Sequence, residues 1–207
     1  MATDLTKGAT RRRRREEPRK GDLREAAILD AAEALLDREG VESVTVEEIA
    51  KGAGISRGAL YFYFGSKQEV VTALVARTMK VLVESAVPSE EENDVDPVKA
   101  IEHAVARTEK LWKEHGVVMR AAVDYGPFIP EVGKLWRDTV GIYIDSLTEV
   151  HIRAGVPNSR GAKGARALAT ALCWGTERNF YMAATGEGTL GEARQRSIEL
   201  WKRAIRA

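Results

Sequence analysis

The sequence contains little of what disulfide-stabilised or membrane-spanning proteins require. It has one cysteine, Cys173, among 207 residues, so no internal disulfide can form and a reducing compartment is expected. No apolar run approaches the ~20 residues of a membrane span. The N-terminal residues lack the apolar segment of a signal peptide. We therefore expect a cytoplasmic chain that does not interact with membranes.

The usual arrangements of catalytic and metal-binding residues are missing as well. The three histidines, His103, His115 and His151, are scattered, without the spacing of paired metal ligands. Cys173 has no motif partner, and no glycine-rich phosphate loop is present. We expect no enzymatic activity, no metal and no cofactor.

No segment alternates apolar and polar residues as a strand would. Apolar residues recur at helical spacing instead, which predicts an all-α fold of about nine helices. The expected helices are 23–39, a short helix capped by Thr45, 57–64, 67–87, 97–115, 117–125, 130–154, 165–185 and one from 189 to 205.

The stretch TVEEIAKGAGISRGALYFYFGSK, residues 45–67, organises the chain. Thr45 and Glu48 have the spacing of a capping box at a helix start, and Gly54 lies in the turn that follows. Ser56 can cap a second short helix that begins at Arg57. Two short helices joined by a turn of this length predict a helix-turn-helix, whose second helix usually enters the major groove of DNA.

Charge and composition divide the chain around this motif. The net charge is only +1, but residues 1–20 hold eight basic and three acidic side chains. We interpret 1–21 as a disordered basic arm that follows phosphates or enters the minor groove once the protein docks. Residues 22–70 are the expected DNA-binding domain, with 67–87 as a connecting helix. After an acidic break, 88–207 are the expected ligand-binding and dimerisation domain.

The run GISRGALYFYFGSK resembles the DNA-binding signature of TetR-type transcriptional repressors, with a Tyr-x-x-Phe pair followed by Ser-Lys and a long helix. The resemblance covers roughly residues 22–80. Further similarities, KLW around Trp136 and the run ATAL…ER at 169–178, point to the branch that controls ethionamide-activating monooxygenases. This resemblance implies a two-domain, homodimeric, all-α regulator.

Seven residues are predicted to bind DNA. Since Leu60 and Phe64 share the core-facing side of the second helix, other side chains are left for DNA. Arg57 is placed to read a guanine, although a phosphate contact alone explains it equally well. The predicted set is Thr45, Ser56, Arg57, Gly58, Tyr61, Tyr63 and Lys67, and the resemblance implies that Thr45, Tyr61, Tyr63 and Lys67 contact the DNA backbone.

In the C-terminal half, aromatic and polar residues share helix faces. Each of them is also consistent with ordinary core packing, but Glu177 on an apolar face would be an unpaired buried charge in a dry core. A mostly apolar cavity accommodates it better. The predicted ligand-binding residues are Trp112, Trp136, Tyr143, Cys173, Thr176, Glu177, Phe180 and Trp201. The resemblance implies that Trp112, Trp136, Thr176, Glu177 and Trp201 line an apolar tunnel, although Cys173 and Thr176 replace the amides usual there.

The opposite face of helix 165–185 combines small residues with aromatics, which suits close helix–helix packing between two copies of the chain. The predicted dimer contacts are Ala167, Ala171, Trp174, Arg178 and Tyr181. The resemblance implies that this helix and the last one pair with their twofold mates in a four-helix bundle.

Together these patterns predict a repressor that binds a near-palindromic double-stranded DNA operator as a homodimer and is released by a hydrophobic small molecule. The alternative is an architectural or constitutive DNA-binding protein without a ligand. That alternative predicts a solidly packed C-terminal domain.

Overall fold

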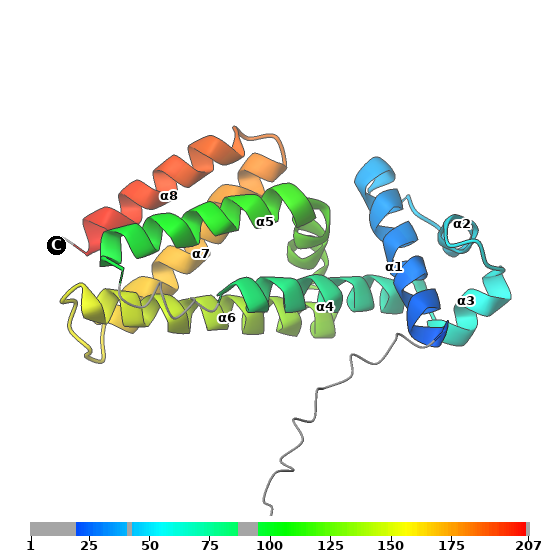
Figure 1. Ribbon diagram of the computed structural model, residues 1–207, viewed down its shortest axis with the longest axis horizontal. Helices are drawn as coiled ribbons and strands as arrows, with labels where there is room; N and C mark the ends of the chain where they lie inside the picture. Colours follow the sequence, from blue (N-terminus) through cyan, green and yellow to red (C-terminus); the bar gives the residue numbers. More distant parts are fainter. Residues whose placement is uncertain (1–19, 41–42, 87–94, 206–207) are drawn as a thin grey trace, which may run out of the picture.

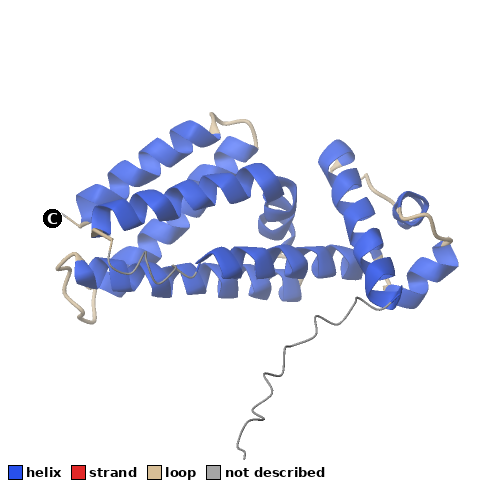
Figure 2. Ribbon diagram, viewed as in Figure 1, coloured by secondary structure: helices blue, strands red, loops and turns tan. Residues whose placement is uncertain are grey.

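The computed structural model describes residues 20–40, 43–86 and 95–205. These residues form eight helices and no strand (Figures 1 and 2), which confirms the predicted all-α fold. The helices are α1 (Lys20–Glu39), α2 (Val46–Gly52), α3 (Arg57–Tyr63), α4 (Lys67–Ala86), α5 (Pro97–Tyr125), α6 (Pro130–Arg153), α7 (Ala165–Ala184) and α8 (Leu190–Ala204).

Helices α1, α2 and α3 form one end of the molecule, and α5 to α8 form a bundle at the other (Figure 1). Helix α4 belongs to both parts, because it packs against α1 and also against α5 and α6. Helix α7 lies between α6 and α8 and packs on both. The long α4 is therefore the connection between the two ends.

The three-helix end is built on apolar side chains that α1 presents once per turn. Ile28, Ala32 and Leu36 are almost fully buried there, together with Ile49 of α2 and Leu60 of α3. Each of the buried Ile and Leu side chains contributes on the order of 1.5–3 kcal/mol of transfer free energy, and Ala32 contributes less. This small core fixes the orientation of two helices that are each too short to be stable alone.

Three predicted helix starts agree with the structure, two at capping boxes and one at an N-cap residue. Thr45 and Glu48 form a reciprocal capping box at α2, and Thr189 and Glu192 form another at α8. The Asp96 carboxylate accepts hydrogen bonds from the first backbone amides of α5. Local hydrogen bonding thus determines where these helices begin.

Two helix boundaries differ from prediction. Helix α1 begins at Lys20, so Lys20 and Gly21 are helical rather than part of an arm that ends at residue 21. The rest of the predicted arm, 1–19, and most of the predicted acidic break lie outside the described residues.

The predicted pair of helices 97–115 and 117–125 is one helix, α5, with a kink at His115 (φ −128°, ψ 16°). Gly116 was expected to end the helix, as glycines in the left-handed conformation commonly do. It is not among the residues with positive φ, so the chain bends at His115 and continues. The described residues therefore contain eight helices rather than about nine.

Candidate functional site

The helix-turn-helix is formed by α2, α3 and the turn between them. Gly54 in this turn has a φ of +66°, a conformation that glycine adopts without steric cost. Ser56 then caps α3, since its Oγ accepts a hydrogen bond from the Ala59 amide at 3.1 Å. The turn and the cap together set the angle at which α3 leaves α2.

Helix α3 turns its aromatic residues to two sides. Leu60 is buried and Phe64, immediately after the helix, is 7% exposed, whereas Tyr61 is 42% and Phe62 86% exposed. Tyr63 is half-buried, and its ring meets that of Phe62 edge-on at 5.5 Å. One face of α3 thus packs on the core and the other is open to a partner such as DNA.

Arg57, at the start of α3, is exposed and already engaged with its neighbours. Its guanidinium forms an ion pair with Glu47 of α2, donates a hydrogen bond to the Tyr61 hydroxyl at 3.3 Å and lies over the Tyr61 ring. The side chain must therefore leave Glu47 to reach a base edge. The sequence pattern gave no indication of this pair.

Lys67, the first residue of α4, has a second role that sequence analysis missed. Its ammonium donates a 2.8 Å hydrogen bond to the Val44 carbonyl, immediately before the cap of α2. This bond ties α4 to the helix-turn-helix. The exposed Thr45 lies beside it.

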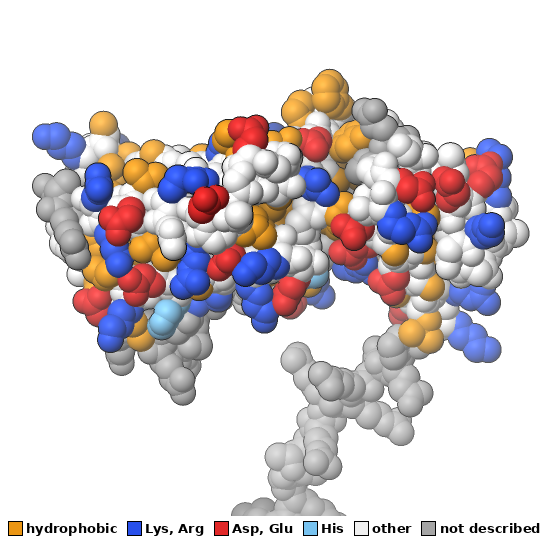
Figure 3. Space-filling view, turned by 90° about the horizontal axis from the view of Figure 1, so that it is seen from above, with side chains coloured by type: hydrophobic (Ala, Val, Ile, Leu, Met, Phe, Trp, Pro, Cys, Tyr) orange, Lys and Arg blue, Asp and Glu red, His pale blue; other side chains and the backbone are white. Residues whose placement is uncertain are grey.

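Basic and acidic side chains are mixed on the surface of the α1–α3 end (Figure 3). Lys and Arg side chains stand at its outer edge, with acidic side chains close by. This surface is less uniformly basic than the sequence of residues 1–20.

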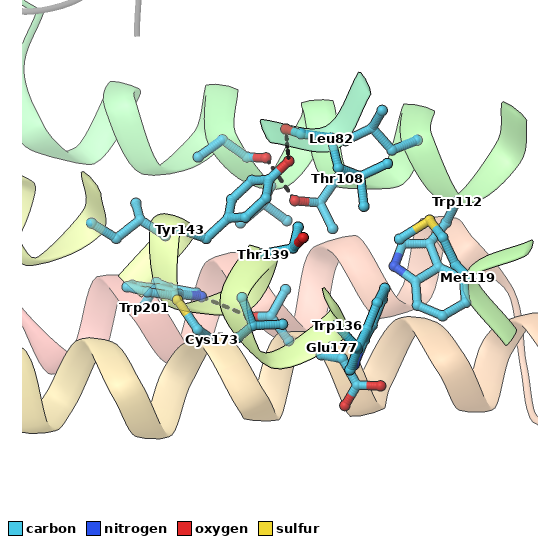
Figure 4. A pocket seen from close by; sticks show the side chains of 16 residues that line it. Leu82, Thr108, Trp112, Met119, Trp136, Thr139, Tyr143, Cys173, Glu177 and Trp201 are labelled. Atoms are coloured by element: carbon cyan, nitrogen blue, oxygen red, sulfur yellow. Dashed lines mark hydrogen bonds between the residues drawn. The ribbon is translucent and has the colours of Figure 1, made fainter. Parts of the chain in front are cut away.

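A second candidate site is a cavity of about 70 Å³ lined by residues of α4, α5, α6, α7 and α8 (Figure 4). Its wall is mostly apolar and aromatic, as ligand pockets usually are. The lining residues are Leu82, Ala104, Val105, Thr108, Leu111, Trp112, Met119, Trp136, Thr139, Val140, Tyr143, Leu147, Cys173, Thr176, Glu177 and Trp201.

Seven of the eight predicted ligand-binding residues lie in this wall, and Phe180 does not. Phe180 shares the inward face of α7 with Thr176, one turn earlier, but it is fully buried among neighbouring side chains. Helical periodicity correctly identified the buried face of α7. Which residues of that face border the cavity depends on the side chains that α5, α6 and α8 place opposite them. The missed lining residues, among them Leu82 and Thr139, come mainly from those other helices and from α4.

Most of the polar groups in the wall already have partners. The Tyr143 hydroxyl donates to the Leu82 carbonyl at 2.8 Å and lies 3.1 Å from the Ser85 hydroxyl. Burial raises the pKa of Tyr143, so this hydroxyl stays protonated and able to donate. The Trp201 indole N–H donates to the Thr176 hydroxyl at 2.8 Å.

Cys173 and Glu177 are affected by burial in the same direction. Burial raises the pKa of the Cys173 thiol to about 12, which keeps it uncharged and unreactive. Burial also raises the pKa of Glu177. Glu177 is 9% exposed, and its Oε1 has no hydrogen-bond partner among the described residues.

The outward face of α7 carries the predicted dimer contacts. Ala167, Ala171 and Arg178 are exposed, whereas Trp174 and Tyr181 are half-buried. Tyr181 is held on its own chain, because its hydroxyl donates to Asp124 at 2.5 Å and the Arg178 guanidinium lies over its ring.

Three further residues on the outward sides of α7 and α8 were not predicted. Gly175 has open space beyond its Cα, and Met182 and Leu200 are large apolar side chains that are exposed. Their exposure extends the surface of small and apolar residues on α7.

A helix-turn-helix with an exposed second helix, joined by a long helix to a bundle with an internal cavity, defines a DNA-binding regulator of transcription. Comparison with known proteins agrees. The family model for bacterial regulatory proteins of the tetR family matches residues 28–74.

Two curated relatives extend the similarity along the chain. The transcriptional regulator EthR of Mycolicibacterium smegmatis is 30% identical over 98% of this chain and 95% of its own length. EthR of Mycobacterium tuberculosis is 32% identical over 89% of this chain and 88% of its own. A tetR-family regulator from Streptomyces coelicolor, 18% identical, shares the fold with a TM-score of 0.73 over 88% of this chain and 78% of its own.

The chain therefore belongs to the TetR family, and it resembles EthR. It is a helix-turn-helix regulator of transcription that binds DNA, and it is not an enzyme. Within the described residues, no helix combines the length and apolar character needed to cross a bilayer.

Proposed function

We propose that this regulator is a repressor that binds a near-palindromic operator as a homodimer and releases it when a hydrophobic small molecule enters the cavity. The observation that carries the proposal is that α4 both follows the helix-turn-helix directly and supplies part of the cavity wall through Leu82. We divide the chain accordingly into a DNA-binding domain at 22–70, the connector α4 and a regulatory domain at 88–207.

On the DNA side, the proposed contacts are Thr45, Ser56, Arg57, Gly58, Tyr61, Tyr63 and Lys67. Except for the half-buried Tyr63 and Lys67, these residues are exposed, at the N-terminal ends of α2 and α3 or along α3. Free amides at helix N-termini and tyrosine hydroxyls suit phosphate oxygens. Arg57 at the start of α3 suits a guanine edge in the major groove.

On the ligand side, the proposed lining residues are Trp112, Trp136, Tyr143, Cys173, Thr176, Glu177 and Trp201. A ligand alters DNA affinity only if it binds one conformation of the protein better than the other. Tyr143 supplies such a difference, because the ring lies in the cavity wall while the hydroxyl is bonded to Leu82 near the C-terminal end of α4. An occupant that displaces the ring breaks or shifts this bond to α4.

In its middle, α4 is bound to the DNA-binding domain by charged pairs. The Arg77 guanidinium donates to Asp30 at 2.6 Å and to Glu33 at 2.7 Å, both on α1. Lys67 adds its bond to Val44. A movement of α4 is therefore transmitted to α1 and to the cap of α2.

For the dimer, we propose that the outward faces of α7 and α8 meet their twofold mates. Ala171 and Gly175 allow close approach of two helices, and the exposed Met182 and Leu200 provide apolar area to bury. Two recognition helices related by this twofold then meet two half-sites of one operator.

The test is a titration of fluorescein-labelled duplexes that tile the DNA upstream of the gene, followed by fluorescence anisotropy with and without compounds from a thermal-shift screen. We expect one near-palindromic duplex to bind at least 1,000-fold more tightly than random DNA, and at least one stabilising compound to weaken that binding. Sequence-independent binding alone would refute the repressor. Specific binding that no stabilising compound weakens would favour the constitutive DNA-binding protein.

A further inference from the structure

Glu177 is the only charged side chain in the cavity wall formed by the described residues, which contains no lysine, arginine or histidine. The Thr108 hydroxyl donates to the Ala104 carbonyl, and the Thr176 and Tyr143 hydroxyls are also bonded. The Glu177 Oε1 remains without a partner although the residue is buried. A buried acceptor of this kind costs free energy until a donor reaches it.

The side chains around Glu177 favour one kind of donor. Four aromatic residues line the cavity, namely Trp112, Trp136, Tyr143 and Trp201, and Glu177 lies in the same wall (Figure 4). Aromatic faces attract ammonium groups through their quadrupoles, most strongly when water is excluded. A carboxylate next to such a face provides the paired charge without which a buried ammonium would be too costly.

We propose that the effector is an apolar molecule that carries an amine or quaternary ammonium group, and that Glu177 pairs with this positive charge within the aromatic wall of the cavity. This inference rests on the proposed ligand role of the cavity. It adds the chemical class of the ligand, namely that apolar amines are selected over apolar acids of the same size. An apolar acid would bring its own negative charge into a wall that contains no lysine, arginine or histidine to receive it.

Burial also prepares Glu177 for this role. Without a ligand, burial favours the uncharged carboxyl, and its pKa is raised. An ammonium group placed next to it favours the charged carboxylate. A cationic ligand would therefore act on the Glu177 pKa in the same direction as the neighbouring Arg178, which lowers it, and against burial, which raises it.

The experiment compares three probes that share one skeleton: 4-phenylbutylamine, 4-phenylbutanol and 4-phenylbutanoate. Each is titrated into the full-length protein at pH 7.5 by isothermal calorimetry, and operator release is measured in parallel by anisotropy. At this pH an ordinary amine is protonated and an ordinary carboxylate is ionised. We expect the amine to bind at least ten-fold more tightly than the alcohol and the acid to bind more weakly than either.

Two variants make the assignment specific to the cavity. Glu177→Gln keeps the shape of the side chain and removes its charge, so the advantage of the amine over the alcohol should fall below three-fold while the alcohol binds as before. Glu187→Gln removes an equal charge from the exposed residues just beyond α7 and should leave all three affinities unchanged. Circular dichroism of both variants verifies their fold.

Each contrary result overturns a different statement. Alcohol binding as tight as amine binding, or an amine preference that survives in Glu177→Gln, would refute the role of Glu177 and leave the cavity as a ligand site. Preference for the acid would refute the proposed ligand class. If none of the three probes binds at millimolar concentration, both the ligand class and the proposed function of the cavity fail.

Discussion

At the scale of single residues, Arg57 is the side chain that we propose to read the DNA sequence. Its position at the start of α3 suits a base edge, yet in the free protein Glu47 and Tyr61 hold it. DNA must therefore replace an exposed ion pair, and such pairs contribute little to stability. The replacement costs little compared with a bidentate guanine contact, which contributes about 1–3 kcal/mol of discrimination.

We predict that Arg57→Ala relaxes sequence preference at one position of each half-site, while Lys67→Ala weakens binding to all sequences alike. The measurement is a competition series with operators substituted one base pair at a time. A ten-fold or larger loss of discrimination confined to one position per half-site would support base reading by Arg57. Uniform loss in both variants would show that Arg57 contacts only phosphate.

Glu177 leads to a prediction about stability. Burial raises its pKa in the folded state, so over the interval above the unfolded value the folded chain holds a proton that the unfolded chain has released. Unfolding then releases a proton, and the free energy of unfolding falls as the pH rises through this interval. Glu177→Gln removes this effect.

We therefore predict that Glu177→Gln raises the melting temperature at pH 7.5 by about 2–4 °C, which corresponds to about 1 kcal/mol for a chain of this size. The gain should shrink toward pH 4.5. Differential scanning fluorimetry without ligand measures it, with Glu187→Gln as the exposed control. A melting temperature that falls, or a gain that does not depend on pH, would contradict a buried and unpaired carboxyl.

Residue spacing predicted reliably which side of a helix is buried. It predicted less reliably which residues that buried side contacts. The inward positions of Leu60 and Phe64 follow from helical periodicity, because one face of α3 must cover the core. The position of Phe180 outside the cavity wall does not, because it depends on the faces that other helices bring opposite. The same reason explains why Leu82 and Thr139 were missed.

At the scale of helices, α4 links the candidate sites. Tyr143 reaches it from the cavity, and Asp30 and Glu33 hold it through Arg77. The kink in α5 adds a contact, since His115 Nδ1 lies 3.7 Å from Glu33 Oε1. The middle of α5 therefore touches the same acidic residue of α1 that pairs with Arg77.

We predict that Tyr143→Phe reduces the effect of an effector on operator affinity several-fold while ligand binding itself persists. The variant keeps the ring in the wall and removes the bond to Leu82. Thr108→Val is the matched control, because it removes another hydroxyl of the wall whose bond stays within α5. Operator titrations with and without the best compound of the screen measure the coupling. If the ratio of operator affinities with and without the compound is unchanged in Tyr143→Phe, α4 responds to the ligand by a route other than Tyr143.

The helix pattern of the sequence was sufficient for the order of the elements and for most of their ends. Caps such as Thr45, Asp96 and Thr189 are local and can be identified from spacing alone. The kink at His115, in contrast, cannot be identified from residue spacing alone. Gly116 permits either a left-handed stop or continued helix, so the outcome depends on packing with other helices, among them α6 and α8, which contact α5.

At the scale of the whole molecule, the geometry of the proposed dimer would determine whether both proposed half-sites are reached. Operators of paired recognition helices have half-sites about 34–36 Å apart or a multiple of that. We predict that Ala171→Arg, which places two like charges in the proposed α7 seam, yields a folded monomer that loses operator binding. Analytical ultracentrifugation tests this, with Ala26→Arg at an exposed position of α1 as the control that makes the same change in size and charge. A variant that remains dimeric would place the interface elsewhere.

The most direct test of the central claim is an operator titration on the cavity-filling variant Thr176→Trp, with the wild type and Thr176→Val alongside. The account predicts that the large side chain acts as a permanent occupant. Operator affinity of the folded dimer should fall at least ten-fold without any compound, and compounds that release the wild type should have no further effect. Thr176→Val removes the hydrogen bond from Trp201 without filling the cavity. Its operator affinity should stay within about three-fold of that of the wild type. Wild-type affinity in Thr176→Trp, together with an unchanged response to compounds, would contradict the claim that the cavity controls DNA binding.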